Sequence, residues 1–146
     1  MAEKILVPLD GSAYSEEVIK YASCLAEKIG AEMLVMHAVE PFTKKTTALS
    51  QLKDVMVEQT NDLLKQAGEE TIAHAKTIAA DFKGAVKYII KIGNPADEIV
   101  KTAKEEGCSL IVIGSRGMNP VEQFLLGSVS SKVSMYAHIP VLIVKK

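Results

Sequence analysis

Five short runs of apolar residues most constrain what this chain can fold into, because they are continuous rather than alternating. They lie at residues 4–9, 32–39, 85–92, 110–113 and 139–144. A strand whose successive residues are all apolar suits a sheet that is covered on both faces, and sheets of that kind are usually parallel. The runs therefore predict five buried strands.

The segments between these runs show the periodicity of amphipathic helices. They predict helices at residues 14–29, 49–80, 94–106 and 129–137, and Gly68 is a point where the long second helix can bend or divide. Strands that alternate with helices predict an α/β fold with one doubly wound, open, parallel five-stranded sheet, helices on both faces and right-handed crossovers. Because no repeat or linker interrupts the pattern, residues 1–146 are expected to form one domain.

Composition and charge exclude several classes of protein. The formal net charge is −1, so no global basic field favours nucleic acid or an anionic membrane as a partner. No apolar run is long enough to span a bilayer, and the opening residues MAEKILVPLD are interpreted as a strand rather than a signal peptide. Cys24 and Cys108 sit in apolar contexts without metal-type spacing. Both thiols are therefore expected to be buried, and a cytoplasmic location is expected.

A series of glycines follows the fourth apolar run. Gly114, Gly117 and Gly127 with Ser128 give the spacing Gly-x2-Gly-x9-Gly-Ser. Ser128 is expected to be the N-cap of the next helix, with free backbone N–H groups just after it. A strand, a glycine loop and a helix N-terminus suit phosphate, because glycine permits close approach and the helix end supplies donors and positive potential. The spacing matches neither the Walker pattern nor the dinucleotide fingerprint.

Most of the chain resembles the universal stress protein family. The matching motifs are VPLDGS at 7–12, HAVEP at 37–41, GNPADEIV at 93–100, GSRG at 114–117, LLGSVSSKV at 125–133 and PVLIV at 140–144. The glycine spacing is similar to that of the ATP-binding subgroup. The resemblance implies an adenine nucleotide alpha hydrolase-like fold with strand order 3-2-1-4-5, which would bring Asp10 beside Gly114.

The same resemblance implies a nucleotide site at specific positions. Its residues would be Pro8, Asp10, Val39, Gly114, Gly117, Gly127, Ser128, Val129 and Ser130. The first two glycines of the series would leave room beside the ribose and phosphates. The backbone N–H groups of Gly127, Ser128 and Val129, together with the Ser128 hydroxyl, would donate to phosphate oxygens. Asp10 would face the adenosine, with Pro8 nearby, and Val39 would line the adenine pocket through its backbone and side chain. The implied ligand is ATP or AMP. A divalent ion, Mg²⁺ or Mn²⁺, is expected with ATP because the site shows few positive side chains to neutralise a triphosphate.

Several of these positions also have structural interpretations. Asp10 is placed to cap the first helix, and a single glycine often ends a strand or precedes a helix cap. His37, His74 and His138 are scattered and have no cysteine or serine partner at useful spacing, so structural roles are expected for them. The sequence shows no nucleophile elbow and no zinc-type spacing, and no catalytic residues are predicted.

Four functions are weighed on these grounds. The first is a nucleotide-binding regulatory protein of the stress response, in which ATP or AMP orders the loops at 115–126 and 41–50 and alters a surface for a partner protein. The second is a slow ATP hydrolase, with only Asp10 and backbone donors in view for phosphoryl transfer. A receiver domain is disfavoured, because the third strand ends in Ile92-Gly93-Asn94 without a carboxylate. The fourth is a dimerisation module without a ligand.

The last apolar run predicts a homodimer. Residues 141–144 are all apolar, and as the last strand they are expected at a sheet edge with unpaired backbone groups. Two copies that pair antiparallel about a two-fold axis would satisfy those groups. Pro140 is expected to remove one donor from the exposed edge. The alternative is a monomer whose edge is shielded by Lys145-Lys146 and a neighbouring helix.

Overall fold

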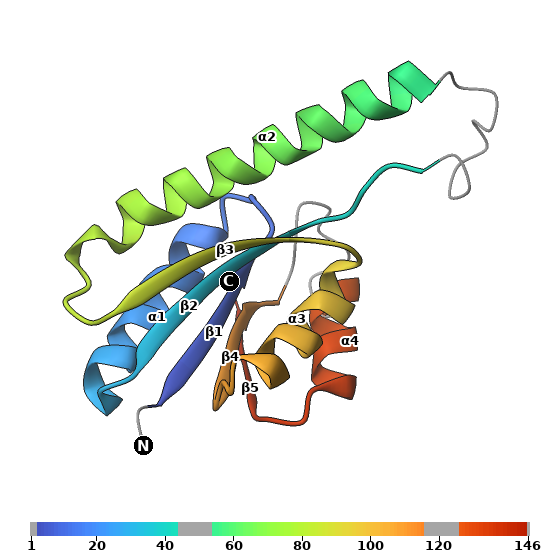
Figure 1. Ribbon diagram of the computed structural model, residues 1–146. Coiled ribbons are helices and arrows are strands. Elements are labelled where there is room, and N and C mark those ends of the chain that lie inside the picture. Colours follow the sequence, from blue (N-terminus) through green and yellow to red (C-terminus); the bar gives the residue numbers. More distant parts are fainter. Residues whose placement is uncertain (1–2, 44–53, 116–125, 146) are drawn as a thin grey trace.

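A computed structural model describes residues 3–43, 54–115 and 126–145 (Figure 1). Its centre is a five-stranded sheet in the order β3-β2-β1-β4-β5, and every neighbouring pair is parallel. The strands are β1 (Lys4–Leu9), β2 (Glu32–Val39), β3 (Val86–Ile92), β4 (Leu110–Gly114) and β5 (Val141–Val144). Both the parallel sheet and the predicted strand order are confirmed.

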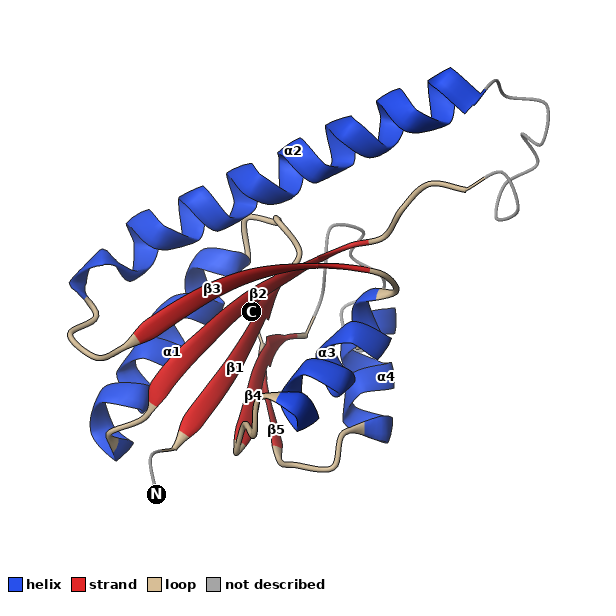
Figure 2. Cartoon of the chain, viewed as in Figure 1, coloured by secondary structure: helices blue, strands red, loops and turns tan. Residues whose placement is uncertain are grey.

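Four helices cover the two faces of this sheet. They are α1 (Ser15–Ile29), α2 (Asp54–Ile78), α3 (Pro95–Glu105) and α4 (Ser128–Tyr136), with a short 3-10 turn η2 (Ala79–Asp81) after α2. Helices α1 and α2 pack on one face, whereas α3 and α4 pack on the other (Figure 2). The two cores divide by strand alternation, because Ile5 and Val7 face the α1–α2 side and Leu6 faces the α3–α4 side. The fold is therefore the doubly wound α/β architecture that the apolar runs predicted.

Local signals explain where two of the helices begin and end. Asn94 caps α3, since its Oδ1 accepts a hydrogen bond from the Asp97 N–H at 3.2 Å, and Pro95 occupies the first turn. Gly30 ends α1 in the left-handed conformation, with φ of 69°, and donates its N–H to the Ala26 carbonyl. Both positions were expected from the sequence.

Gly68 does not bend or divide α2, contrary to one expectation. The helix runs without interruption from Asp54 to Ile78, and Gly68 is buried against the sheet. A Cβ at Gly68 would lie 2.9 Å from Val39 Cγ2 and 3.1 Å from His37 Cδ2. This glycine therefore serves close approach between α2 and β2 rather than a change in direction.

The expectation that both cysteines are buried holds for only one of them. Cys108 is buried, and desolvation raises the pKa of its thiol to about 11. Cys24 is exposed, because the buried stripe of α1 passes through Ala22 and Ala26 and leaves residue 24 on the outer face. The apolar neighbours of Cys24 in the sequence belong to that stripe, and for this reason the local composition wrongly predicted a buried thiol at residue 24.

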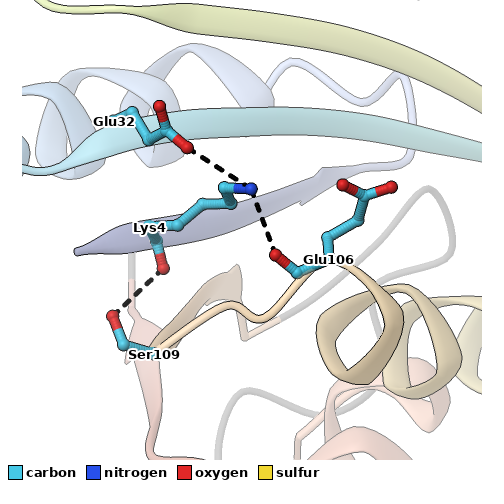
Figure 3. A network of polar contacts seen from close by, with 4 residues as sticks. All are labelled: Lys4, Glu32, Glu106 and Ser109. Atoms are coloured by element: carbon cyan, nitrogen blue, oxygen red, sulfur yellow. Dashed lines mark hydrogen bonds and ion pairs between the residues drawn. The ribbon is translucent and has the colours of Figure 1, made fainter. Parts of the chain in front are cut away.

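Lys4 links neighbouring segments at the amino end of the sheet through polar contacts (Figure 3). Its Nζ lies 3.3 Å from Glu32 Oε1 on β2 and donates to the Glu106 carbonyl at 3.1 Å, while its own carbonyl accepts from Ser109 Oγ at 3.2 Å. One residue of β1 thus joins β2 and the turn between α3 and β4. The opposite, carboxyl end of the sheet carries polar loops instead. Within the described residues, no helix is long and apolar enough to cross a membrane.

The close contact at Gly68 gives a stability prediction. We expect Gly68→Leu to lower the free energy of unfolding by about 1–3 kcal/mol, because the new side chain overpacks against buried Val39 and half-buried His37. Urea denaturation followed by circular dichroism measures the change. The matched control is Gln66→Leu, at an exposed position two residues earlier on the same helix, which should leave stability nearly unchanged. Equal stability of the two variants would show that α2 does not depend on close approach at Gly68.

Candidate functional site

The carboxyl ends of the parallel strands meet at one edge of the sheet. Strand order reverses between β1 and β4, and ligands of doubly wound sheets bind outside the carboxyl ends at such a point. The loop that leaves β1 begins with exposed Asp10, and the segment that leaves β4 begins with buried Ser115. The resemblance to a nucleotide-binding family had predicted this pair of neighbouring loops.

A buried hydrogen-bond lock joins the end of β4 to the start of α4. The Ser115 carbonyl accepts from the Gly127 N–H at 2.7 Å and from Ser130 Oγ at 3.1 Å. Ser130 Oγ also lies 3.1 Å from the Gly127 carbonyl, and its residue is only 3% exposed. Ser115 is fixed in turn by its N–H, which donates to the Val144 carbonyl of β5 at 2.9 Å. The N-terminus of α4 is therefore held rigidly at the sheet edge.

The N-cap of α4 is Gly127 and not Ser128, which corrects the prediction. Gly127 has φ of −64° and ψ of 160°, and its carbonyl accepts the first intrahelical bond from the Ser131 N–H at 2.9 Å. Glycine and serine are both favoured at this position, so residue type alone could not decide between them. The residue at which α4 begins is instead set by the lock, in which the Gly127 N–H donates to the Ser115 carbonyl.

Three backbone donors remain at the start of α4. The N–H groups of Ser128, Val129 and Ser130 precede the first intrahelical bond and have no carbonyl partner within the helix. Ser128 is exposed, and the first turn contains no acidic residue. The expectation that Gly127 would also donate its N–H to a phosphate is wrong in this structure, because that group donates to Ser115. The donors that remain suit an anion.

The missing side chain at Gly114 makes room for the protein itself. A Cβ at this position would lie 2.8 Å from Tyr14 Cδ1 and 3.2 Å from Val18 Cγ2. Tyr14 crosses the end of β4 in this space and donates its hydroxyl to the Val144 carbonyl at 2.9 Å. Gly114 therefore has a packing role on the α1 side of the sheet. Gly117, its predicted companion, lies outside the described residues.

The remaining predicted residues lie at the ends of β1 and β2. Asp10 does not cap α1, because its Oδ1 accepts from the Ser12 N–H at 2.9 Å and the N-cap position is Tyr14. Pro8 is buried within β1. Val39 is 7% exposed and turns its side chain towards Gly68 of α2, while its carbonyl accepts from the Gly93 N–H at 2.9 Å. Only Asp10 among these three has an exposed functional group.

A cavity of about 560 Å³ opens on the α1–α2 side of the same edge. Asp10 and Val39 contribute to its wall, but no residue of β4 or α4 lines it. Sequence analysis missed most of its polar residues, which are Ser12, Ser15, His37, Glu40, Glu70, Thr71 and His74. They come from two strand ends and two helices, so no local motif joins them. Only the short spacing of Ser12 and Ser15 before a helix was visible in the chain.

The histidines fit the structural roles expected for them where contacts are described. His37 Nδ1 lies 2.8 Å from the Leu9 carbonyl, so this nitrogen carries the hydrogen and donates across the β1–β2 pair. Within residues 3–43, 54–115 and 126–145, no group of three His, Cys, Asp or Glu side chains is arranged to hold a metal ion. The basic side chain one turn into α4, Lys132, is paired with Asp97 of α3 at 3.1 Å. The anion-type donors at the edge are thus backbone groups.

Together, the fold and this edge define a doubly wound α/β domain with a phosphate-type helix N-terminus at its switch point. The family model described as the universal stress protein family matches residues 1–145. The chain therefore belongs to the universal stress protein family.

Individual relatives agree with this assignment. Universal stress protein YxiE of Bacillus subtilis is 36% identical over 148 aligned positions, which cover 99% of this chain and 100% of the relative. The solved structure of MJ0577, a protein of Methanocaldococcus jannaschii, superposes with a TM-score of 0.84 at 29% identity and covers 100% of this chain and 97% of that chain. A universal stress protein solved in complex with cAMP has a TM-score of 0.71 at 26% identity, with coverage of 97% and 96%.

The lock at Ser130 gives a second stability prediction. We expect Ser130→Ala to lower the free energy of unfolding by about 0.5–1.5 kcal/mol, because the Ser115 carbonyl loses one of its two donors and keeps the Gly127 N–H. Ser131→Ala is the matched control, since residue 131 is exposed on the same helix turn. Denaturant titration of both variants measures the difference. A Ser130→Ala protein as stable as the control would mean that the hydroxyl does not hold the edge.

Proposed function

We propose that this protein is a regulatory adenine nucleotide-binding protein, with ATP or AMP as its ligand. The observation that carries the proposal is the set of three free N–H groups at the start of α4, held in place by the lock to Ser115. Such a fixed helix end stabilises phosphate without reorganisation on binding. The first turn of α4 has no acidic side chain to repel that group.

The comparisons support an adenine nucleotide in particular. The relative with a TM-score of 0.71 and 26% identity was solved with cAMP, which carries both an adenine and a phosphate. On the proposal, the phosphates lie on Ser128, Val129 and Ser130, and the adenosine extends towards Asp10 on neighbouring β1. The resemblance also gives Pro8 and Val39 to the adenine side, but both are buried here and the Val39 carbonyl is bonded to Gly93, so Asp10 is the exposed group of the three.

The proposed regulation acts through occupancy of this site. Bound nucleotide would order the loop at 115–126 and so change a surface offered to a partner protein. Most of that loop, with Gly117, lies outside the described residues. Mg²⁺ or Mn²⁺ would accompany ATP, because the part of the site within the described residues offers backbone dipoles rather than free cationic side chains to a triphosphate.

Calorimetry tests the proposal directly. We expect ATP and AMP to bind with dissociation constants in the micromolar range, on the order of −8 kcal/mol, and Mg²⁺ to strengthen the binding of ATP. Gly127→Val should abolish binding while the fold persists, because its side chain enters the space needed by the phosphates. Ser128→Ala should weaken binding only modestly, since the backbone N–H stays in place.

The control for these variants is Ser131→Ala, whose N–H is already used within the helix. It should bind nucleotide like the unchanged protein. Absence of heat with ATP, AMP and cAMP at millimolar concentration would refute the proposal. Undiminished binding by Gly127→Val would instead reject the start of α4 as the phosphate site.

We also propose a homodimer through the outer edge of β5. The strand is at the end of the sheet, as predicted, and pairs with β4 on one side only. The Pro140 and Val144 carbonyls accept from Ile111 and Ser115, so even-numbered residues of this strand face β4. Val141 and Ile143 therefore direct their backbone groups outwards. The expectation that Pro140 protects the outer edge is wrong, because it belongs to the set that faces β4.

This register sharpens the test of the dimer. We expect Val141→Pro to shift the protein towards monomer, because it removes an outward N–H without touching the bonds to β4. Val141→Thr keeps both the N–H and the β-branched shape, and should remain dimeric. Sedimentation equilibrium at tens of micromolar, on the order of a modest dimer's dissociation constant, measures both variants. An unchanged protein that sediments as a 15.8 kDa monomer would exclude this dimer.

A further inference from the structure

Strand β3 forms one border of the sheet, and β5 forms the other (Figure 2). On its inner side, the Ala85 carbonyl accepts from the Met33 N–H at 3.0 Å, and the Gly93 N–H donates at 2.9 Å to β2. Odd-numbered residues of β3 therefore bond to β2, and even-numbered residues direct their N–H and C=O groups outwards. This β3 border consists of Val86, Tyr88, Ile90 and Ile92. Among the described residues, no strand pairs with it.

Three lysines follow the same border at every fourth residue. Lys83 precedes the strand, and Lys87 and Lys91 lie within it. Residues 82–96 contain no Asp or Glu, although the whole chain has a formal net charge of −1. Within the part of the chain that the structure describes, none of these lysines is in an ion pair. The border is therefore a basic strip on a nearly neutral protein.

The lysines of the strand lie on one face of the sheet. Side chains of a strand alternate between faces, so Lys87 and Lys91 share the α3–α4 face with Ile89, which lies between them and packs against that core. Acidic side chains stand at the ends of the strand. Asp81 precedes it in η2, and Glu98 of α3 lies beside Gly93, where a Cβ would be 2.7 Å from its Oε1.

The opposite face of β3 is apolar. Val86, Tyr88 and Ile90 pack against the α1–α2 core as partly buried side chains. Ile92 continues this face past the core and is 61% exposed. Lys76 of α2 lies 5.5 Å from the centroid of the Tyr88 ring and adds a further cation near the border. A strand added here would meet apolar side chains on one face and ammonium groups on the other.

Charge decides what pairs with the β3 border. A second copy of the chain would bring like charges together, because an antiparallel two-fold pair centred on Ile89 places Lys87 of each copy opposite Lys91 of the other. Strand β5 has no charged residue between Val141 and Val144, so it suits a second copy where β3 does not. A segment with carboxylates on one face would instead form charge-assisted bonds with the lysines of β3.

We propose that the β3 border binds an extended acidic segment of a partner protein, which adds to the sheet as a sixth strand. Its main chain pairs with the outward N–H and C=O groups, and its carboxylates, four residues apart on one face, meet Lys87 and Lys91. Strand addition takes affinity from main-chain bonds and specificity from alternate side chains. The inference does not depend on the nucleotide proposal, since β2 and β1 separate β3 from the strand that carries the lock.

Capped peptides of one design test the charge requirement. The acidic probe is acetyl-Thr-Val-Glu-Val-Thr-Val-Glu-Val-Thr-amide, and the two comparison peptides carry Gln or Lys in place of both Glu residues. In ¹⁵N-resolved NMR titrations at low salt, we expect the acidic peptide to bind with a dissociation constant of roughly 0.1–1 mM. The Gln peptide should bind about tenfold more weakly and the Lys peptide more weakly still. Salt at about 0.5 M should weaken the acidic peptide, because it screens the ion pairs.

Amide hydrogen exchange distinguishes strand addition from adsorption through charge alone. The N–H groups of Tyr88 and Ile90 point outwards, so the acidic peptide should slow their exchange. The N–H groups of Lys87, Ile89 and Lys91 already donate to β2 and should change little. This alternation along one strand is the signature expected of a sixth strand.

Paired variants test the residues, with circular dichroism to show that each folds. Lys87→Glu with Lys91→Glu should lose the acidic peptide and gain the Lys peptide. Lys101→Glu with Lys104→Glu makes the same change of net charge at exposed positions on α3, and should bind the acidic peptide like the unchanged protein. Ile92→Pro removes one outward N–H and should weaken binding about fivefold, whereas Ile92→Thr keeps that group and should not.

Several outcomes would overturn the inference. If no peptide binds at millimolar concentration, the lysines only guard the edge against aggregation. If the three peptides bind alike, or if exchange at Tyr88 and Ile90 does not slow, the border does not accept an acidic strand. Slow exchange at these two residues without peptide, increasing with protein concentration, would assign the border to a second copy. Loss of nucleotide binding in Gly127→Val with peptide binding retained is the expected sign of independent surfaces.

Discussion

Burial of β1 on both faces is the constraint on which the rest of the fold depends. Ile5, Leu6 and Val7 are all 0% exposed, although consecutive side chains of a strand point to opposite faces. Both faces must therefore be covered by helices. Strands β2 and β4 flank β1. Helix α1, between β1 and β2, covers one face of the sheet, and helix α3, which precedes β4, covers the other. The switch point between β1 and β4 follows from that requirement.

The edge formed by the carboxyl ends of the strands also has two sides, one next to α1 and α2 and the other next to α3 and α4. On the α3–α4 side, Ser115 and Ser130 hold a helix N-terminus whose first turn lacks acidic residues. On the α1–α2 side, another helix N-terminus opens into a cavity whose polar wall includes carboxylates. Tyr14 and Gly114 lie between the two sides, since the ring fills the space left by the missing Cβ. The two helix ends are thus close along the edge but meet different surroundings.

Sequence alone predicted the elements of the fold well, because each carries its own local signal. Strands β1 and β4 are largely apolar runs with buried centres, whereas the edge strand β3 carries Lys87 and Lys91 and has no buried residue, so the prediction of five buried strands fails there. The start of α3 is marked by Asn94 and Pro95. The resemblance to a family supplied the strand order, which periodicity does not contain. The errors occurred where tertiary contacts decide: Gly127 rather than Ser128 caps α4, and Gly68 admits close packing instead of a bend.

The candidate site was only partly predictable for the same reason. The donors of Ser128 and Val129 follow from a glycine-serine pair before a helix, whereas the lock depends on Ser115, which is far from Ser130 in the chain. The cavity on the other side draws on four separate elements, and none of its polar residues forms a motif with another beyond Ser12 and Ser15. Whether a hydroxyl keeps a free donor depends on the partners that the fold brings to it. Ser130 Oγ is bonded to the Ser115 carbonyl, whereas Ser12 Oγ and Ser15 Oγ have no partner among the described residues.

The two helix ends also show why an N-terminal dipole does not by itself specify a ligand. Each carries the partial positive charge of a helix N-terminus, but the Ser15 N–H of α1 already donates to the Ser12 carbonyl at 3.1 Å, and the first turn of α1 contains Glu16 and Glu17. Carboxylates near α1 raise the energy of any anion that arrives without its own positive charge, and no acidic residue stands in the first turn of α4. The dipole therefore favours a negative group at each helix end, while the neighbouring side chains set how strongly such a group is held. Selectivity at this edge follows from the charges around each helix end and not from the helix ends themselves.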